Sequence, residues 1–246
     1  ALSDAPEREL AIAGAAGEVR GTPEGLIGQL GSPEVGGSYF TFSDENNDLI
    51  WSFLAECNKR GWLYKGSDSM PWCTRCGTGI SQHEMTDGYA DRDDPSAYFG
   101  FPLVDRPGEE LLAWTTTPWT IPSSQAISLG CELEYNLVQC KTKSGPVRLI
   151  CSQLLLESVM ERLEIEDFQV LASCLGESLE GLVAKHPFYE RDIPVLLGDH
   201  VTTDAGTGCV HTAPDHGIED FVVAKKYGIG TLNYVMDNGT FRDDVA

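Results

Sequence analysis

Short apolar and β-branched runs, separated by turn-forming residues, fill the sequence after residue 96 and constrain the fold more than any other feature. In chain order these runs are YFGFPL, LLAWTTT, YNLVQC, VRLICS, FQVLAS, IPVLLG and GCVHTA. Their length and composition are typical of β-strands, and segments such as RPGE and KSGP supply turns. Two stretches with helical spacing interrupt them, residues 152–163, which begin with a serine cap, and residues 218–228, which end on a glycine. The pattern predicts an α+β fold, in which a strongly curved, β-barrel-like sheet of short strands carries helices on its outside.

The chain before residue 96 has a different character. Residues 1–37 are rich in Ala, Gly, Glu and Pro, and their weak helical periodicity predicts a surface segment of helix and loop. Within residues 46–66 four apolar residues recur at helical spacing: Ile50, Phe53, Leu54 and Cys57. The following WLYKG reads as a short strand, and the polar stretch DGYADRDDPS marks a boundary. We therefore expect three parts, residues 1–37, 38–95 and 96–246.

Composition and charge narrow the classes of partner. The 246 residues include 38 acidic and 17 basic side chains, which gives a formal net charge of −21. Because phosphate contacts need Lys and Arg, such a chain is not expected to hold nucleic acid by broad electrostatic attraction. No run approaches the length of a membrane span, and no basic-then-apolar signal sequence begins the chain. We expect a cytoplasmic monomer whose eight cysteines are reduced thiols.

Two of the cysteines, Cys73 and Cys76, have the spacing of a motif. A thioredoxin-like redox pair opens a helix, but here Gly77-Thr78-Gly79 follows, and glycines are poor residues for a first helical turn. The pair instead favours a metal-binding knuckle, although a structural zinc wants four ligands and this sequence has no second pair with ligand spacing. Half of a zinc site, ordinary structural thiols and a redox pair all stay open at this point.

A threonine-rich segment is the first candidate for chemistry. Residues 114–122 read WTTTPWTIP, so four threonines fall within six residues around a rigid Pro-Trp, at the end of an expected strand. Hydroxyls that both donate and accept suit a polar small molecule such as a ribose or an ester. The alternative is a β-rich stretch with ordinary threonine content.

A second cluster, DAGTGCVHTAPDHGIEDF, spans residues 204–221. Gly206 and Gly208 allow close backbone approach, His211 ends a strand, and Asp220 falls in the first turn of the next helix. Alone, such a histidine is usually an ordinary core or surface residue, and such a carboxylate usually complements the helix dipole. Together they indicate a pocket in which the carboxylate pairs with an ammonium group. His216 we interpret as a possible helix cap.

These two clusters carry a resemblance. WTTTPWT followed by GTGCVHTAPDHGIEDF resembles the editing insertion of the isoleucyl-tRNA synthetase family, and GWLYKGSDSMPWCTRCGTGISQHEM resembles the segment leading into it. The resemblance covers roughly residues 38–246. Leucine and valine relatives more usually carry Thr-Thr-Arg-Pro, and the His-Ile-Gly-His and Lys-Met-Ser-Lys-Ser signatures of the synthetic site are absent here. The resemblance makes residues 38–95 a partial catalytic-domain linker with half a zinc knuckle, which a second cysteine pair completes in the family.

The resemblance implies post-transfer editing, the hydrolysis of the ester of mischarged Val-tRNA(Ile), without amino-acid activation. This family is itself the well-known case in which one methylene discriminates too weakly between isoleucine and valine, so that a second, hydrolytic site is needed. The implied partners are the tRNA(Ile) acceptor end and its mischarged valine. Asp220 would bind the α-ammonium, and His211 would wall the pocket against isoleucine.

The other implied site residues surround these two. Thr116, Thr117 and Thr120 would contact the terminal adenosine or the ester and order the attacking water. Further substrate-binding positions are Thr115, Trp119, Ser124 and Gly206. Of these, Ser124 stands where bacterial relatives often carry the longer Asn. The group that takes the water's proton stays open, with His211 or a ribose hydroxyl as candidates. A module that docks the acceptor end without hydrolysing it is the alternative function.

Overall fold

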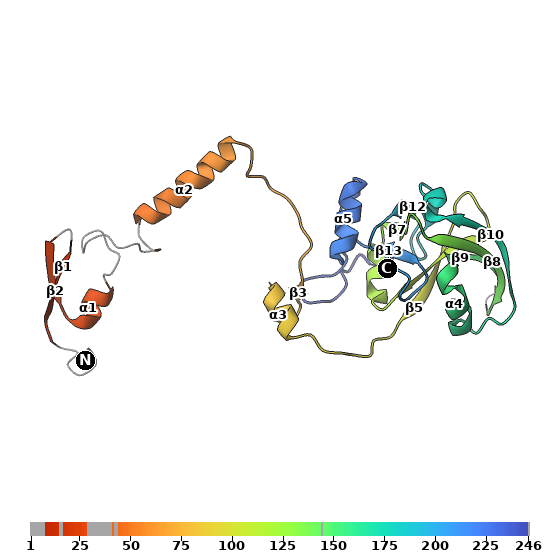
Figure 1. Ribbon diagram of the computed structural model, residues 1–246, viewed down its shortest axis with the longest axis horizontal. Coiled ribbons are helices and arrows are strands. Elements are labelled where there is room, and N and C mark those ends of the chain that lie inside the picture. Colours follow the sequence, from red (N-terminus) through yellow and green to blue (C-terminus); the bar gives the residue numbers. More distant parts are fainter. Residues whose placement is uncertain (1–7, 15–16, 29–40, 42–43, 144, 246) are drawn as a thin grey trace. The chain divides into compact units, whose positions relative to one another are not determined.

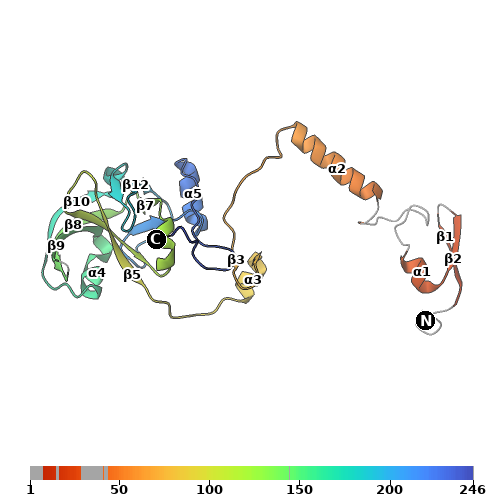
Figure 2. The same ribbon diagram turned by 180° about the vertical axis from the view of Figure 1, so that it is seen from behind.

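The computed structural model describes residues 8–14, 17–28, 41, 44–143 and 145–245, and the chain divides into two compact units, Ala1–Ser67 and Asp68–Ala246. Figures 1 and 2 show the elements of each unit from opposite sides. Within the described ranges, no helix combines the length and the apolar character that crossing a membrane requires. The first unit holds a hairpin and two helices, and the second holds the predicted strands.

The first unit begins with strands where we expected a helix. β1 (Leu10–Gly14) and β2 (Gly17–Gly21) form an antiparallel hairpin that places Ile12 opposite Val19. The helical interpretation of this segment is therefore wrong. Its alanines and glycines are compatible with the residue spacing of a helix and with that of a strand, and Leu10, Ile12 and Gly14 alternate as a strand requires. The short helix α1 (Pro23–Gly28) follows and buries Leu26. The rest of residues 1–37, namely 1–7, 15–16 and 29–37, lies outside the described part.

The predicted helix of residues 46–66 is confirmed as α2 (Asp44–Lys59). It ends just before Gly61, whose φ of +70° suits glycine, and an ion pair joins Glu56 to Arg60 one turn later. Several of its large apolar side chains are exposed, with Ile50 48% and Phe53 67% accessible. The expected strand WLYKG does not form, since residues 62–66 have no regular structure.

The second unit is built on two open sheets. The five-stranded sheet has the order β10-β8-β9-β6-β5, and the four-stranded sheet has the order β11-β12-β7-β13. The first contains β5 (Ala97–Pro102), β6 (Glu109–Thr115), β8 (Glu134–Thr142), β9 (Gly145–Ser152) and β10 (Phe168–Leu175). The second contains β7 (Ala126–Leu129), β11 (Val183–Lys185), β12 (Asp192–Leu197) and β13 (Cys209–Thr212). All seven runs that we read as strands are strands.

The α+β class with short strands is confirmed, but the strands of the described chain do not close into a barrel. The two sheets meet at one edge through a bridge between Leu103 and Ala184, and the N–H of Ser152 donates to the carbonyl of Thr207 at 2.8 Å. The barrel-like expectation failed because β7 and β11 went unrecognised. These strands have four and three residues, too few to show a period, and they complete the second sheet.

The core lies between and beside the sheets. One buried cluster includes Phe101, Leu111, Ile127 and Tyr135, which come from both sheets. A second cluster packs α4 (Leu156–Arg162) against the five-stranded sheet through Val159 and Met160. Burying each such side chain stabilises the fold by roughly 1.5–3 kcal/mol. The rigid centre that results holds the loops at the strand ends in place.

Helices cover both sheets, as Figures 1 and 2 show. The helix predicted over residues 152–163 begins as a 3₁₀ turn, η3 (Gln153–Leu155), and continues as α4. Ser152 does not cap it, because its side chain is fully buried and makes no cap hydrogen bond. The helix predicted over residues 218–228 is confirmed as α5 (Ile218–Lys226), which packs on the four-stranded sheet through Val223.

A small hairpin precedes the sheets. β3 (Trp72–Cys73) pairs with β4 (Thr78–Gly79), and the helix α3 (Gln82–Asp87) follows. α3 begins with a capping box, in which Ser81 and Glu84 satisfy each other's backbone N–H groups. The described hairpin therefore presents both motif cysteines on one short turn.

Candidate active site

The threonine segment is a tight turn at the end of β6. The hydroxyl of Thr115 accepts from the N–H of Thr117 at 3.0 Å and lies 3.2 Å from the hydroxyl of Thr117. Thr115 is buried, whereas Thr116 and Thr117 are exposed. Thr115 therefore shapes the turn, and it leaves the next two threonines at the surface of the site.

The 3₁₀ helix η2 (Pro118–Ser123) continues from this turn and brings Thr120 to His211. The hydroxyl of Thr120 donates to the carbonyl of Thr117 at 2.8 Å, and it lies 3.3 Å from Nε2 of His211. His211 is on β13, in register with Ile127 on β7, so the antiparallel pairing of these strands places it beside η2. The structure thus joins two clusters that lie 91 residues apart in the sequence.

His211 is an uncharged, buried imidazole. Burial lowers its pKa to about 4, and the nearby rings of His216 and His186 add to this effect. Its Nδ1 is buried and has no hydrogen-bond partner among the described residues. At neutral pH the ring therefore offers an apolar wall and one unused polar atom.

Asp220 stands in the first turn of α5, at the next loop. Its Oδ2 accepts from the N–H of Ala213 at 2.9 Å, and its Oδ1 lies 3.7 Å from Nε2 of His200. Burial raises its pKa, although the Ala213 N–H and His200 act in the opposite direction. Gly217, the N-cap of α5, leaves room for this carboxyl group, because a Cβ there would lie 3.2 Å from its carbon. The carboxylate has one anchored oxygen and one oxygen that a cation could take.

The remaining predicted site residues line two different cavities. Thr115, Thr116 and Gly206 line a cavity of about 310 Å³, together with His200 and Asp204. Trp119 instead packs edge-to-face on His216, with ring centroids 5.3 Å apart, and helps to line a different cavity. The site residues named from the sequence therefore do not all face one cavity.

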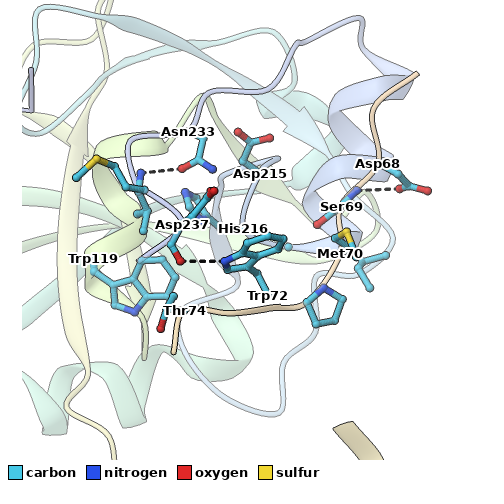
Figure 3. Close-up of a pocket in the computed structure, with 15 residues that line it drawn as sticks. Asp68, Ser69, Met70, Trp72, Thr74, Trp119, Asp215, His216, Asn233 and Asp237 are labelled. Carbon is cyan, nitrogen blue, oxygen red and sulfur yellow. Dashed lines mark hydrogen bonds between the residues drawn. The ribbon is translucent and has the colours of Figure 1, made fainter. Parts of the chain in front are cut away.

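Figure 3 shows the second cavity, of about 460 Å³, between the cysteine hairpin and the loops on either side of α5. Trp72 and Trp119 lie on it, and the Trp72 indole N–H donates to the carbonyl of Asp237 at 2.9 Å. Asp215 and Asp237 also line it. Within its lining the charged residues are carboxylates, so this cavity is unsuited to a phosphate group.

Ser124 and His216 take places that the sequence did not indicate. Ser124 is fully buried and its hydroxyl has no hydrogen-bond partner in the described structure. His216 does not cap α5, because Gly217 is the N-cap; its Nε2 lies 3.1 Å from the hydroxyl of Ser123 instead. His216 therefore braces η2 at Ser123, three residues after the Thr120 that His211 contacts.

Three residues that support the site were missed in the sequence. Nε2 of His186 lies 2.8 Å from the carbonyl of Ile121, and Arg191 donates to the carbonyl of Ser124 at 3.0 Å, so both hold η2 and the residue that follows it. His200 faces Asp220. None of these three residues belongs to a recognisable sequence motif, so their contacts could be seen only in the structure.

The cysteine hairpin is closed by backbone N–H groups that point at Cys73. The N–H of Cys76 donates to Sγ of Cys73 at 3.4 Å, the N–H of Gly77 donates to the Cys73 carbonyl, and Gly77 has a φ of +66°. This N–H from Cys76 is the main reason that the pKa of the Cys73 thiol is lowered. No group of three or more potential metal ligands comes together in the described ranges.

Comparisons with known proteins now bear on this geometry. The family model described as "Leucyl-tRNA synthetase, editing domain" matches residues 97–244. The isoleucine–tRNA ligase of Hahella chejuensis is 44% identical over 220 residues, which cover 84% of this chain and 23% of that protein. The isoleucine–tRNA ligase of Teredinibacter turnerae is 42% identical over 244 residues, or 94% of this chain and 26% of that protein. The chain thus spans about a quarter of the length of these relatives.

Among solved structures, the editing domain of the P. knowlesi cytosolic leucyl-tRNA synthetase is 15% identical. The match has a TM-score of 0.47 and covers 62% of this chain and 75% of the P. knowlesi domain. The family model and the curated relatives agree with the resemblance seen in the threonine and histidine clusters. The chain therefore belongs to the aminoacyl-tRNA synthetase editing-domain family, and it carries the editing domain of an isoleucyl-tRNA synthetase.

Proposed function

We propose that this domain hydrolyses the ester bond between valine and tRNA(Ile), and leaves the isoleucyl ester intact. The observation that carries the proposal is the meeting of the two clusters. Thr120 contacts the neutral His211, and two residues further on the N–H of Ala213 holds Asp220. A hydroxyl, an uncharged wall and an ionisable carboxylate in one place suit an aminoacyl ester, which has a carbonyl, a side chain and an ammonium group.

Asp220 binds the α-ammonium of the esterified amino acid in this proposal. Its Oδ2 is fixed by Ala213, so the carboxylate keeps one orientation and Oδ1 can accept the substrate's charge. Burial makes the ionised carboxylate costly, as its raised pKa shows, and an incoming ammonium ion relieves this cost. The site therefore favours an aminoacyl ester over an uncharged ester.

His211 acts as a wall in this proposal and not as the base. A group with a pKa near 4 is a weak proton acceptor at neutral pH, because an efficient general base titrates close to the working pH. The ring is held between Thr120 and the neighbouring strand, so it cannot easily yield to a longer side chain. We infer that a group of the substrate, such as a ribose hydroxyl, accepts the water's proton.

The exposed Thr116 and Thr117 supply hydroxyls to the ester and to the attacking water. Their positions follow from the turn that Thr115 fixes through the N–H of Thr117. Hydroxyls that are already in place stabilise a developing tetrahedral oxyanion without reorganising during the reaction. Ser124 has no such role in this proposal, since its hydroxyl is buried away from them.

The acceptor end of tRNA(Ile) is the proposed partner, recognised locally. A net charge of −21 and a carboxylate-lined cavity beside Trp119 do not favour extensive phosphate contact. Cys73 and Cys76 would supply two of the ligands of a structural zinc, which would stiffen the hairpin that carries Trp72. We propose that the domain works as a cytoplasmic monomer.

The test is single-turnover deacylation of Val-tRNA(Ile) and Ile-tRNA(Ile) by this chain. We expect the valyl ester to be released faster than both the isoleucyl ester and the uncatalysed reaction. Binding of either ester without any acceleration of hydrolysis would reject the proposal and indicate a docking module. Equal release of both esters would reject the role of His211 as a size filter.

A further inference from the structure

His200 is a partly buried histidine beside the proposed ammonium site, and neither sequence cluster includes it. It lies in the loop between β12 and β13, and its Nε2 is 3.7 Å from Oδ1 of Asp220. The two side chains are similarly buried, with 16% and 17% of their surface accessible. The contact is thus made with the oxygen that Ala213 leaves unanchored.

The ring of His200 has unused hydrogen-bonding capacity. Both of its nitrogens are buried, and neither has a hydrogen-bond partner within the described structure. Buried polar groups are nearly always paired, and those that are not need an explanation. Because His200 also lines the cavity of Thr115, Thr116 and Gly206, a small movement of the ring would bring it to Asp220 or to a molecule in that cavity.

The backbone around His200 is shaped to accept its ring. A Cβ at Gly198 would lie 2.6 Å from Cε1 and 2.8 Å from Nδ1 of His200, which is closer than real contacts of this kind. The glycine therefore lets the imidazole lie directly over the chain, in the side-chain position that faces Asp220. This fit is independent of the distance to the carboxylate.

We propose that His200 is a positioning residue for Asp220, which keeps the free oxygen of that carboxylate available and turned toward the substrate's ammonium group. The role rests on the proposed function, because it acts through the residue that binds the ammonium. An imidazole N–H that faces a carboxylate oxygen stabilises the ionised form and limits its rotation. The cost of ionising Asp220 in a buried place is thereby reduced before the substrate arrives.

Few charged groups act on Asp220, so the effect of His200 can be isolated. Glu219 from its own helix raises the pKa of Asp220, whereas His200 from the facing loop and the Ala213 N–H lower it. Asp204 lines the same cavity as His200. Removal of His200 leaves the carboxylate with the Ala213 N–H as its remaining support.

The experiment follows the side-chain carboxyl of Asp220 by ¹³C NMR during a pH titration of the whole chain, with Asp220→Asn to assign the signal. In His200→Phe, which keeps a flat ring over Gly198, we expect the pKa of Asp220 to rise. His200→Gln keeps an N–H donor and should recover part of the wild-type value. His83→Phe removes an exposed histidine on α3 and should leave the titration unchanged.

A second readout uses the reaction. For deacylation of Val-tRNA(Ile), His200→Phe should raise KM by roughly tenfold with a smaller change in kcat, because ammonium binding is weakened. An Asp220 titration that is the same in wild type and His200→Phe overturns the proposal, whether or not the chain deacylates. If His200→Phe does not fold, Gly198→Ala, which displaces the ring, replaces it and must also shift the titration. Absence of deacylation together with the expected NMR shift would reject the proposed function alone.

Discussion

Replacement of Asp220 by Asn removes the negative charge of the proposed ammonium site and little else. The amide oxygen has the size of Oδ2, so it can still accept from the N–H of Ala213, which now lies 2.9 Å from Oδ2. The substitution also removes a buried carboxylate whose pKa is raised by burial, so no stabilising charge is lost from the free protein. We therefore expect the free energy of unfolding to change by less than about 1 kcal/mol.

The effect on the reaction should be much larger. A hydrogen bond to a charged partner contributes about 1.5–3 kcal/mol, which corresponds to a loss of roughly 10- to 100-fold in kcat/KM. The assay is single-turnover release of valine from Val-tRNA(Ile), with urea unfolding to confirm the fold. Glu219→Gln is the matched control, because Glu219 is the preceding residue of α5 and is exposed. A loss smaller than twofold in the folded Asp220→Asn variant, or an equal loss in Glu219→Gln, would refute the assignment of the ammonium to Asp220.

Three further predictions concern Thr120, His211 and Gly208. Thr120→Val keeps the shape of the side chain but removes its hydrogen bonds to the Thr117 carbonyl and His211. Thermal unfolding should therefore show that the free energy of unfolding falls by about 1–2 kcal/mol, and selectivity for the valyl ester should also fall. An unchanged free energy of unfolding would contradict this prediction. The pKa of His211 is lowered to about 4 in the fold, so the stability from its neutral form is complete above about pH 6.5 and is lost as pH falls toward 4. Denaturation of wild type and His211→Gln across this range should show a steeper decline in the wild type. Gly208 has a φ of +75°, and a Cβ there would lie 2.5 Å from that of Ser152, so Gly208→Ala should cost at least about 2 kcal/mol in urea unfolding.

Long periodic segments were the easiest part of the fold to predict. α2 and α5 were recognised because their apolar spacing continues over several turns and glycines follow their ends. The hairpin of β1 and β2 was misread, since alanine and glycine satisfy both periods. β7 and β11 were missed because they are too short to alternate, and with them the second sheet. What failed was therefore the assembly of the sheets.

The candidate site was predictable as two clusters but not as one place. The contact between Thr120 and His211 depends on the pairing of β7 with β13, and β7 gave no signal in the sequence. His200 was unpredictable for a similar reason, because its contact with Asp220 is made by a loop that enters from another strand. The resemblance to a known family indicated the roles of the site residues, whereas their contacts with one another were visible only in the structure.

The most direct measurement is a crystal structure of this chain with a non-hydrolysable valyl-adenosine amide. We predict that the ammonium group lies within hydrogen-bonding distance of Oδ1 of Asp220, and that the valine side chain contacts His211 and Thr120. An analogue seated in the cavity between Trp72 and Trp119, with its ammonium group away from Asp220, would contradict the account.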